Sequence, residues 1–80
     1  MREVQAAAAT NPLVQLSPRQ LEVLHLLSLG MDNDQIAERL YISRNTVKFH
    51  VRTIYGRLGV HNRVEASRVL AGSRPVAPAA

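Results

Sequence analysis

Residues 43 to 58 read SRNTVKFHVRTIYGRL, and this stretch carries two helical patterns at once. At about 100° per residue, one narrow apolar stripe is formed by Val47, Val51, Ile54 and Leu58. The opposite side of the same helix, here called the outer face, holds Asn45, Lys48, Phe49, Arg52 and Gly56. Asn and Arg can make paired hydrogen bonds to adenine or guanine edges, Lys reaches guanine or phosphate, and Phe can contact a thymine methyl group. The pattern favours a helix that packs one face into a core and places the other in a major groove.

A polar helix face with two basic residues is often only a solvated surface. Three features of this chain favour a nucleic-acid surface instead. No acidic residue lies between Glu38 and Glu65, and Phe49 has no reason to be exposed on a merely solvated face. The helix also follows a short helix after a tight turn. The basic residues in the acid-free interval are Arg39, Arg44, Lys48, Arg52, Arg57 and Arg63.

Four helix start signals position this stretch within a fold. Helices are expected to begin after Ser17 with Gln20, after Asp32 with Gln35, after Ser43, and after Asn62 with Glu65. Almost nothing resembles a strand, so the expected fold is all-α, a four-helix domain. The second and third helices are joined by only about three residues, 41 to 43, which is typical of a helix-turn-helix.

The ends of the chain differ in composition from its middle. Residues 1–15 are Ala-rich, contain an Asn-Pro break and are expected to be a linker or disordered arm. Residues 16–72 are expected to form the folded domain. Residues 73–80 hold prolines among small residues and are expected to be a disordered tail.

Length and charge restrict the class of protein. The chain has 80 residues, no cysteine and a net charge of +4, with a pI near 10.7. One small domain leaves little room for an enclosed active site, and the positive charge favours an acidic partner such as nucleic acid. No segment has the length of a membrane span or the apolar core of a secretion signal. A cytoplasmic protein that does not bind membranes is therefore expected.

Catalytic and metal sites are not expected. The three histidines, His25, His50 and His61, lie in different segments, and no histidine or carboxylate stands at ligand spacing to any of them. His50 lies beside the apolar stripe and is interpreted as a packed side chain. No nucleophile is paired with a base. The expectation is a binding protein with no enzyme activity, no metal and no cofactor.

An ordered set of motifs resembles a known family. The segments LSPRQLEVLHLLSLG, DQIAERLYIS, TVKFHV, RLGV and NRVEA are similar to the DNA-binding domain of the LuxR family, which is shared with output domains of NarL/FixJ-type response regulators. The resemblance implies that the third helix, about residues 44–58, enters the major groove, and that dimers bind pseudo-palindromic sites. By motif position, Lys48, Phe49 and Arg52 contact the groove, while Thr46 and the start of the second helix lie near phosphates.

The expected DNA-binding residues combine the outer face with candidate phosphate donors. The first turn of the third helix favours an anion, because its backbone N–H groups are free and the helix dipole is positive there. Asp34 stands where the family often has a basic residue, and its charge would repel a phosphate. The complete expected set is Arg44, Asn45, Thr46, Lys48, Phe49, Arg52 and Arg57.

The expected function is sequence-specific binding of double-stranded DNA by a transcriptional regulator. The chain would be the output domain of a two-component or quorum-type regulator, or a stand-alone small regulator. Expected partners are DNA, RNA polymerase and a second copy of the chain, bound through a small-residue strip on the fourth helix, Val64, Ser67 and Ala71. A protein-interaction module on the same fold is the alternative. RNA binding has less support, since Phe49 is the only candidate for an exposed aromatic platform.

Overall fold

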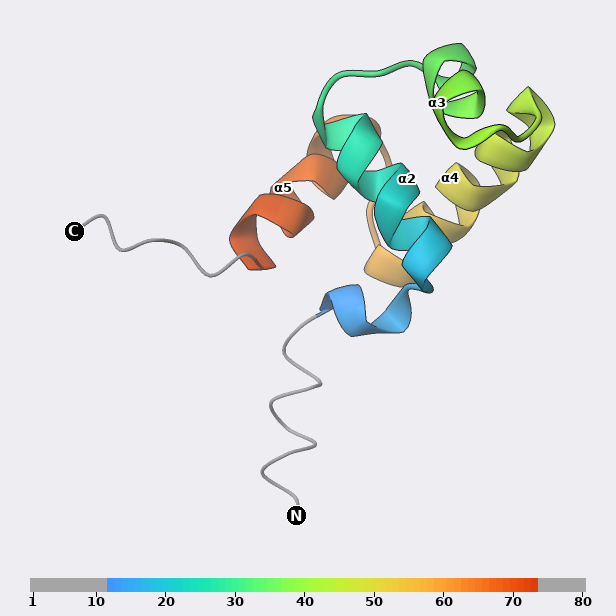
Figure 1. The fold of residues 1–80 in the computed structure, drawn as a ribbon. Helices are drawn as coiled ribbons and strands as arrows, with labels where there is room; N and C mark the ends of the chain where they lie inside the picture. Colours follow the sequence, from blue (N-terminus) through green and yellow to red (C-terminus); the bar gives the residue numbers. More distant parts are fainter. Residues whose placement is uncertain (1–11, 74–80) are drawn as a thin grey trace.

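The computed structural model describes residues 12–73. These residues form a short 3-10 helix and four α-helices, with no strand in this part of the chain (Figure 1). The all-α, four-helix architecture expected from the sequence is confirmed. In chain order the elements are η1 (Pro12–Gln15), α2 (Pro18–Ser28), α3 (Asn33–Leu40), α4 (Arg44–Leu58) and α5 (Arg63–Ser73).

Reciprocal hydrogen bonds determine where α2 and α3 begin. The Gln20 backbone N–H donates to Ser17 Oγ at 3.1 Å, and the Ser17 N–H donates to Gln20 Oε1 at 2.9 Å. Asp32 and Gln35 repeat this arrangement at the start of α3, with both distances 2.9 Å. Each pair satisfies two backbone donors that the first helical turn leaves without a carbonyl. Both capping boxes are predicted by the sequence and confirmed.

The cap of α5 differs in detail from a capping box. The Glu65 N–H donates to Asn62 Oδ1 at 2.9 Å, as expected for an N-cap. The Glu65 carboxylate, however, accepts from the backbone N–H of His61 at 2.8 Å, one residue before the cap. The side chain therefore holds the incoming loop as well as the helix start.

The turn between α3 and α4 depends on a left-handed residue. Tyr41 has φ 58° and ψ 45°, and the Ile42 N–H donates to the Ala37 carbonyl at 3.0 Å. A non-glycine residue in this conformation costs about 1–2 kcal/mol, so the surrounding packing must offset it. Ile42 contributes, because it is partly buried against the core. This three-residue turn sets the angle at which α4 leaves α3.

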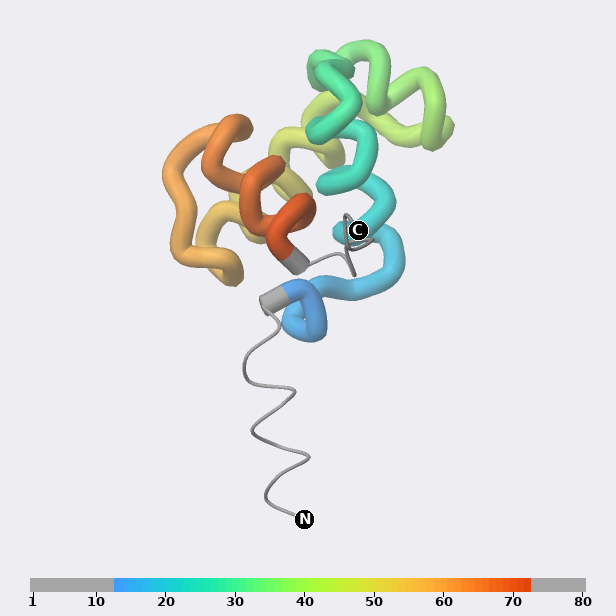
Figure 2. Tube along the Cα trace, turned by 90° about the vertical axis from the view of Figure 1, so that its left-hand side faces the viewer, coloured from blue at the N-terminus to red at the C-terminus, as the bar shows by residue number. Residues whose placement is uncertain are grey.

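The core lies where α2 crosses α4 and α5, while α3 packs on the start of α4 (Figures 1 and 2). On α4, Val47 and Ile54 are fully buried, and Val51 and Leu58 are partly buried against them, which confirms the predicted stripe. The buried apolar residues are Leu16, Val23, Leu24, Leu26, Leu27, Ile36, Val47, Ile54, Ala66 and Leu70. The outer face of α4 therefore points away from this core.

The folded part begins before the expected boundary at residue 16. Pro12–Gln15 belong to the expected arm, yet they form η1, which packs on α4 and α5. Leu13 is partly buried against the core. Four residues of 3-10 helix carry no readable period, so the sequence pattern does not predict them. Residues 1–11 of the expected arm and 74–80 of the expected tail lie outside the described residues. Within residues 12–73, no helix is long and apolar enough to cross a bilayer.

Candidate nucleic-acid interface

The outer face of α4 is presented to solvent along its length. Asn45, Lys48, Arg52 and Gly56 are all exposed, and Phe49 is 60% exposed. A large aromatic side chain left in water loses the stabilisation that burial would give, so its exposure points to a binding role. The structure thus brings the predicted base-contacting residues together on one accessible surface.

Lys48 and Arg52 are free of intramolecular partners among the residues that the structure describes. Either side chain can therefore bind an outside acceptor without breaking a contact within the domain. Four arginines do have partners: Arg19 with Glu22, Arg44 with Asp34, Arg57 with the Gln15 carbonyl, and Arg63 with the Met31 carbonyl.

Arg44 is joined to α3 by an ion pair. Its Nε lies 2.9 Å from Asp34 Oδ1, and the two side chains are 61% and 65% exposed. The first residue of α4 thus meets the second residue of α3. The sequence indicates that both residues lie near phosphate but does not predict that they meet, because no local pattern links positions ten apart.

The first turn of α4 retains donors that can face an anion. Thr46 donates its backbone N–H to Ser43 Oγ at 3.0 Å, and the two hydroxyls lie 2.9 Å apart. This N-cap uses one of the orphan donors, while the N–H groups of Arg44 and Asn45 have no intrahelical carbonyl to reach. Backbone donors and the positive end of the helix dipole both favour a phosphate here.

Arg57 is separated from the other predicted contact residues. Its Nη1 donates to the Gln15 carbonyl at 2.8 Å, which ties the last turn of α4 to η1. It lies five residues beyond Arg52, about 7.5 Å along the helix axis, and on another side of the helix. A phosphate contact by Arg57 stays a prediction. It would require the guanidinium to break its hydrogen bond to the Gln15 carbonyl, or to bind the carbonyl and the phosphate together.

A hollow of about 360 Å³ adjoins the outer face at the start of α3. Arg63 reaches it from α5 and is held by a hydrogen bond to the Met31 carbonyl. Arg63 is one of the basic residues of the acid-free interval, but its position beside the start of α4 is not predictable from the sequence. The hollow is lined by Asp32, Asn33, Asp34, Arg44, Lys48 and Arg63.

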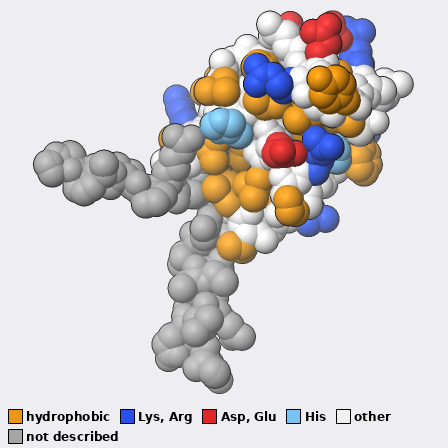
Figure 3. All heavy atoms as spheres, in the orientation of Figure 1, with side chains coloured by type: hydrophobic (Ala, Val, Ile, Leu, Met, Phe, Trp, Pro, Cys, Tyr) orange, Lys and Arg blue, Asp and Glu red, His pale blue; other side chains and the backbone are white. Residues whose placement is uncertain are grey.

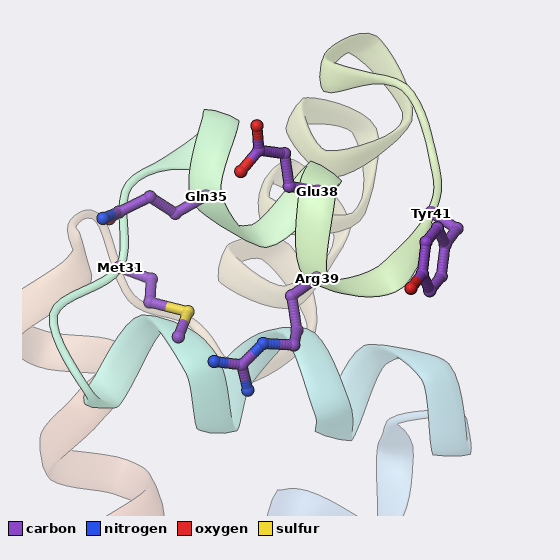
Figure 4. Close-up of a pocket in the computed structure, with 5 residues that line it drawn as sticks. All are labelled: Met31, Gln35, Glu38, Arg39 and Tyr41. Carbon is purple, nitrogen blue, oxygen red and sulfur yellow. The ribbon is translucent and has the colours of Figure 1, made fainter.

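A second hollow, of about 420 Å³, lies on the other side of α3 (Figure 4). Arg39 extends from α3 over α2, and Tyr41, which is 95% exposed, stands at the edge. Glu38 and Gln35 complete the polar lining. On the face of the molecule drawn in Figure 3, basic side chains stand beside acidic ones. Since Glu38 and Arg39 of opposite charge both line the second hollow, this side of α3 lacks the one-sided charge of the outer face.

The three histidines do not assemble a metal site. No group of three or more His, Cys, Asp or Glu side chains within residues 12–73 is arranged to hold a metal ion. His50 is half-buried, and its Nδ1 is buried with no hydrogen-bond partner in the described part of the chain. Its ring centroid lies 6.0 Å from that of Phe49. The ring is packed, so Nδ1 is closed to an outside ligand.

The small-residue strip of α5 lies over two shallow hollows that it shares with the end of α2. Val64 is 57% exposed, Ala71 is exposed and Ser67 is half-buried. Leu29, which is not among the predicted interface residues, is 61% exposed and lines one of these two hollows beside Ser67. The apolar surface here is wider than the strip predicted from α5 alone.

The sequence of the domain matches a known family along most of its length. A profile of the bacterial regulatory proteins of the luxR family matches residues 14–70. The chain belongs to the LuxR family. It is a LuxR-type DNA-binding domain, so the expected family and the expected kind of domain are both confirmed.

Individual proteins that are similar to this chain are named as regulators. The chain is 46% identical over 57 residues to a nitrate/nitrite response regulator protein homolog of Haemophilus influenzae, covering 71% of this chain and 27% of the relative. It is 46% identical over 57 residues to the transcriptional regulatory protein LnrK of Bacillus subtilis, covering 71% and 26%. It is 45% identical over 60 residues to the nitrate/nitrite response regulator protein NarP of Escherichia coli, covering 75% and 28%. The chain thus spans about a quarter of the length of these relatives.

Proposed function

We propose that this domain binds double-stranded DNA sequence-specifically, with α4 as the recognition helix in the major groove. The observation that carries the proposal is the pair Lys48 and Arg52, which are exposed beside the exposed Phe49 on one face of α4 and have no partner within residues 12–73. A helix of 15 residues is about 22 Å long and fits a groove about 12 Å wide. The apolar stripe on its other side holds it to the core.

The residues of the site divide into two proposed roles. Asn45, Lys48, Phe49 and Arg52 on the outer face contact base edges. The remaining expected residues, Arg44, Thr46 and Arg57, contact phosphates on either side of the groove. Such backbone contacts orient the domain and supply affinity, whereas the base contacts supply specificity.

The salt dependence of binding tests this function. The logarithm of the association constant is expected to fall against the logarithm of salt concentration with a slope of about −0.9 for each neutralised phosphate. If Arg44 and Arg57, the two cations assigned to phosphates, each neutralise one phosphate, the slope is about −1.8. Fluorescence anisotropy with a duplex obtained by in vitro selection measures it. A slope near zero would instead support the protein-interaction module, and preference for RNA over duplex DNA would support the RNA-binding alternative.

We also propose that two copies pair on DNA through α5. The small-residue strip of Val64, Ser67 and Ala71 lets two helices approach closely, and the exposed Leu29 extends its apolar surface. A two-fold interface uses the same surface on both copies. The strip is too small for the roughly 1,200 Å² of a stable interface, so the free domain is monomeric.

Ser67→Glu tests the pairing. On a duplex with two half-sites about one helical turn apart, the parent domain is expected to bind cooperatively. The variant places two like charges across the two-fold axis, so it should lose cooperativity. The control is the affinity of the variant for a single half-site, measured in the same titration. It should change less than about twofold, because a surface change far from the recognition helix α4 has little effect. Equal cooperativity in parent and variant would show that α5 is not the dimer surface.

The role of the complete protein is a further proposal. The relatives are about four times as long as the match, and two of them are named response regulators, which supports an output domain of a larger two-component or quorum-type regulator. A stand-alone small regulator fits the domain equally. In either case we propose a cytoplasmic, non-catalytic protein that acts on transcription through DNA and contact with RNA polymerase.

A further inference from the structure

We infer that Asp34 is a negative determinant of DNA affinity, which competes with the DNA backbone for Arg44. The inference rests on the proposed function, because it concerns the same interface. It assigns a role to an acidic residue within a surface that the sequence shows as basic. In this role Asp34 lowers affinity for any duplex, so that occupancy of a site depends more strongly on base contacts by the outer face.

The geometry makes Asp34 a direct competitor. Asp34 Oδ1 lies 2.9 Å from Arg44 Nε in an ion pair, so the carboxylate occupies one side of the guanidinium that a phosphate would use. Both side chains are more than 60% exposed, and water screens such a pair strongly. An arriving phosphate can therefore displace the Asp34 carboxylate or share the guanidinium with it. Either way, part of the attraction between the phosphate and Arg44 is lost.

Among residues 12–73, Arg44 is the one charged or hydrogen-bonding partner of the Asp34 side chain. The other acid in the same hollow, Asp32, is engaged as the N-cap of α3, where its Oδ1 accepts from the Gln35 N–H. The Asp34 carboxylate forms no such cap and is held only by the ion pair with Arg44 in the described part of the chain. Its position in the first turn of α3 gives a favourable interaction with the helix dipole. Asn keeps the shape of the side chain and loses only these exposed charge interactions, so removing the charge should leave the fold intact.

Lys48 lines the same hollow as Asp34 and Arg44. A carboxylate in this hollow reduces the positive potential that a phosphate meets there. Asp34 thus acts in two ways, by pairing with Arg44 and by repelling the DNA backbone. The first requires Arg44 and the second does not, so the two can be separated by mutation.

Asp34→Asn is the primary test. The variant is expected to bind both a selected duplex and a random-sequence duplex roughly threefold to tenfold more tightly than the parent at low salt. The gain should shrink as salt is added, because the interactions are between exposed charges. Glu22→Gln is the matched control, since it makes the same charge change in an exposed pair, with Arg19 at 3.2 Å on α2. It is expected to change affinity less than about twofold.

Arg44→Ala separates the two effects of Asp34. In this background Asp34→Asn should tighten binding only about twofold, because the pair is gone and only repulsion remains. Circular dichroism and urea unfolding of each variant establish that the fold is retained, and Asn is well accepted near a helix start.

Five results would overturn the inference. Weaker binding by Asp34→Asn would show that Asp34 positions Arg44 for DNA. An equal gain in both Arg44 backgrounds, or an equal gain from Glu22→Gln, would show a general charge effect. If the parent binds duplexes with the expected salt slope while Asp34→Asn is unchanged, only this inference fails. A parent that shows no salt-dependent binding overturns the proposed function and this inference with it.

Discussion

Lys48→Ala and Arg52→Ala are each expected to weaken binding to a selected target duplex by about 1–3 kcal/mol. Both side chains are exposed on the outer face of α4 and have no partner within the described residues, so each loss removes a contact with DNA and none within the domain. A titration at constant salt measures the effect. The same variants should lose much less affinity for a random-sequence duplex, because only base contacts depend on sequence.

Arg39→Ala is the matched control for these variants. It removes the same charge from an exposed position, but Arg39 extends over α2, on the far side of α3 from the outer face (Figure 4). We expect affinity for the target to change less than about twofold, since distant exposed charges are screened. Unchanged affinity in both Lys48→Ala and Arg52→Ala, with the fold intact by circular dichroism, would refute the groove assignment.

Ile54→Ala is expected to lower the free energy of unfolding by about 2–5 kcal/mol. Ile54 is fully buried on the core side of α4, and truncation leaves a cavity that neighbouring side chains fill only in part. Small domains have a total stability of about 5–15 kcal/mol, so this loss is a large fraction. Urea denaturation followed by circular dichroism measures it, and DNA binding should fall as the folded fraction falls.

Leu29→Ala provides the comparison for Ile54→Ala, because it removes the same number of carbon atoms from a side chain that is 61% exposed. Its expected loss is within about 0.5 kcal/mol, as for most surface changes. A loss below about 1 kcal/mol for Ile54→Ala, or equal losses for the two variants, would contradict the described core.

Local order was predictable from the sequence because it arises between residues three or four apart. The caps at Ser17 and Asp32 involve a side chain and a backbone group within one turn, so residue type and spacing are enough to predict them. The apolar stripe through Val47 and Ile54 follows from helical periodicity, and the same periodicity placed Lys48 and Arg52 on the outer face. The family membership rests on the same kind of ordered local pattern.

The partners of the charged residues were decided by the packing of one helix against another. Arg57 meets the Gln15 carbonyl 42 residues away, and Arg63 meets the Met31 carbonyl 32 residues away. The stretch without acids between Glu38 and Glu65 is real along the chain, yet the turn at Tyr41 brings Asp34 back to Arg44. Charge interactions depend on distance in space, and no period in the sequence encodes that distance. The basic outer face was therefore predictable, whereas the position of Asp34 at its edge follows only from the packing of α3 on α4.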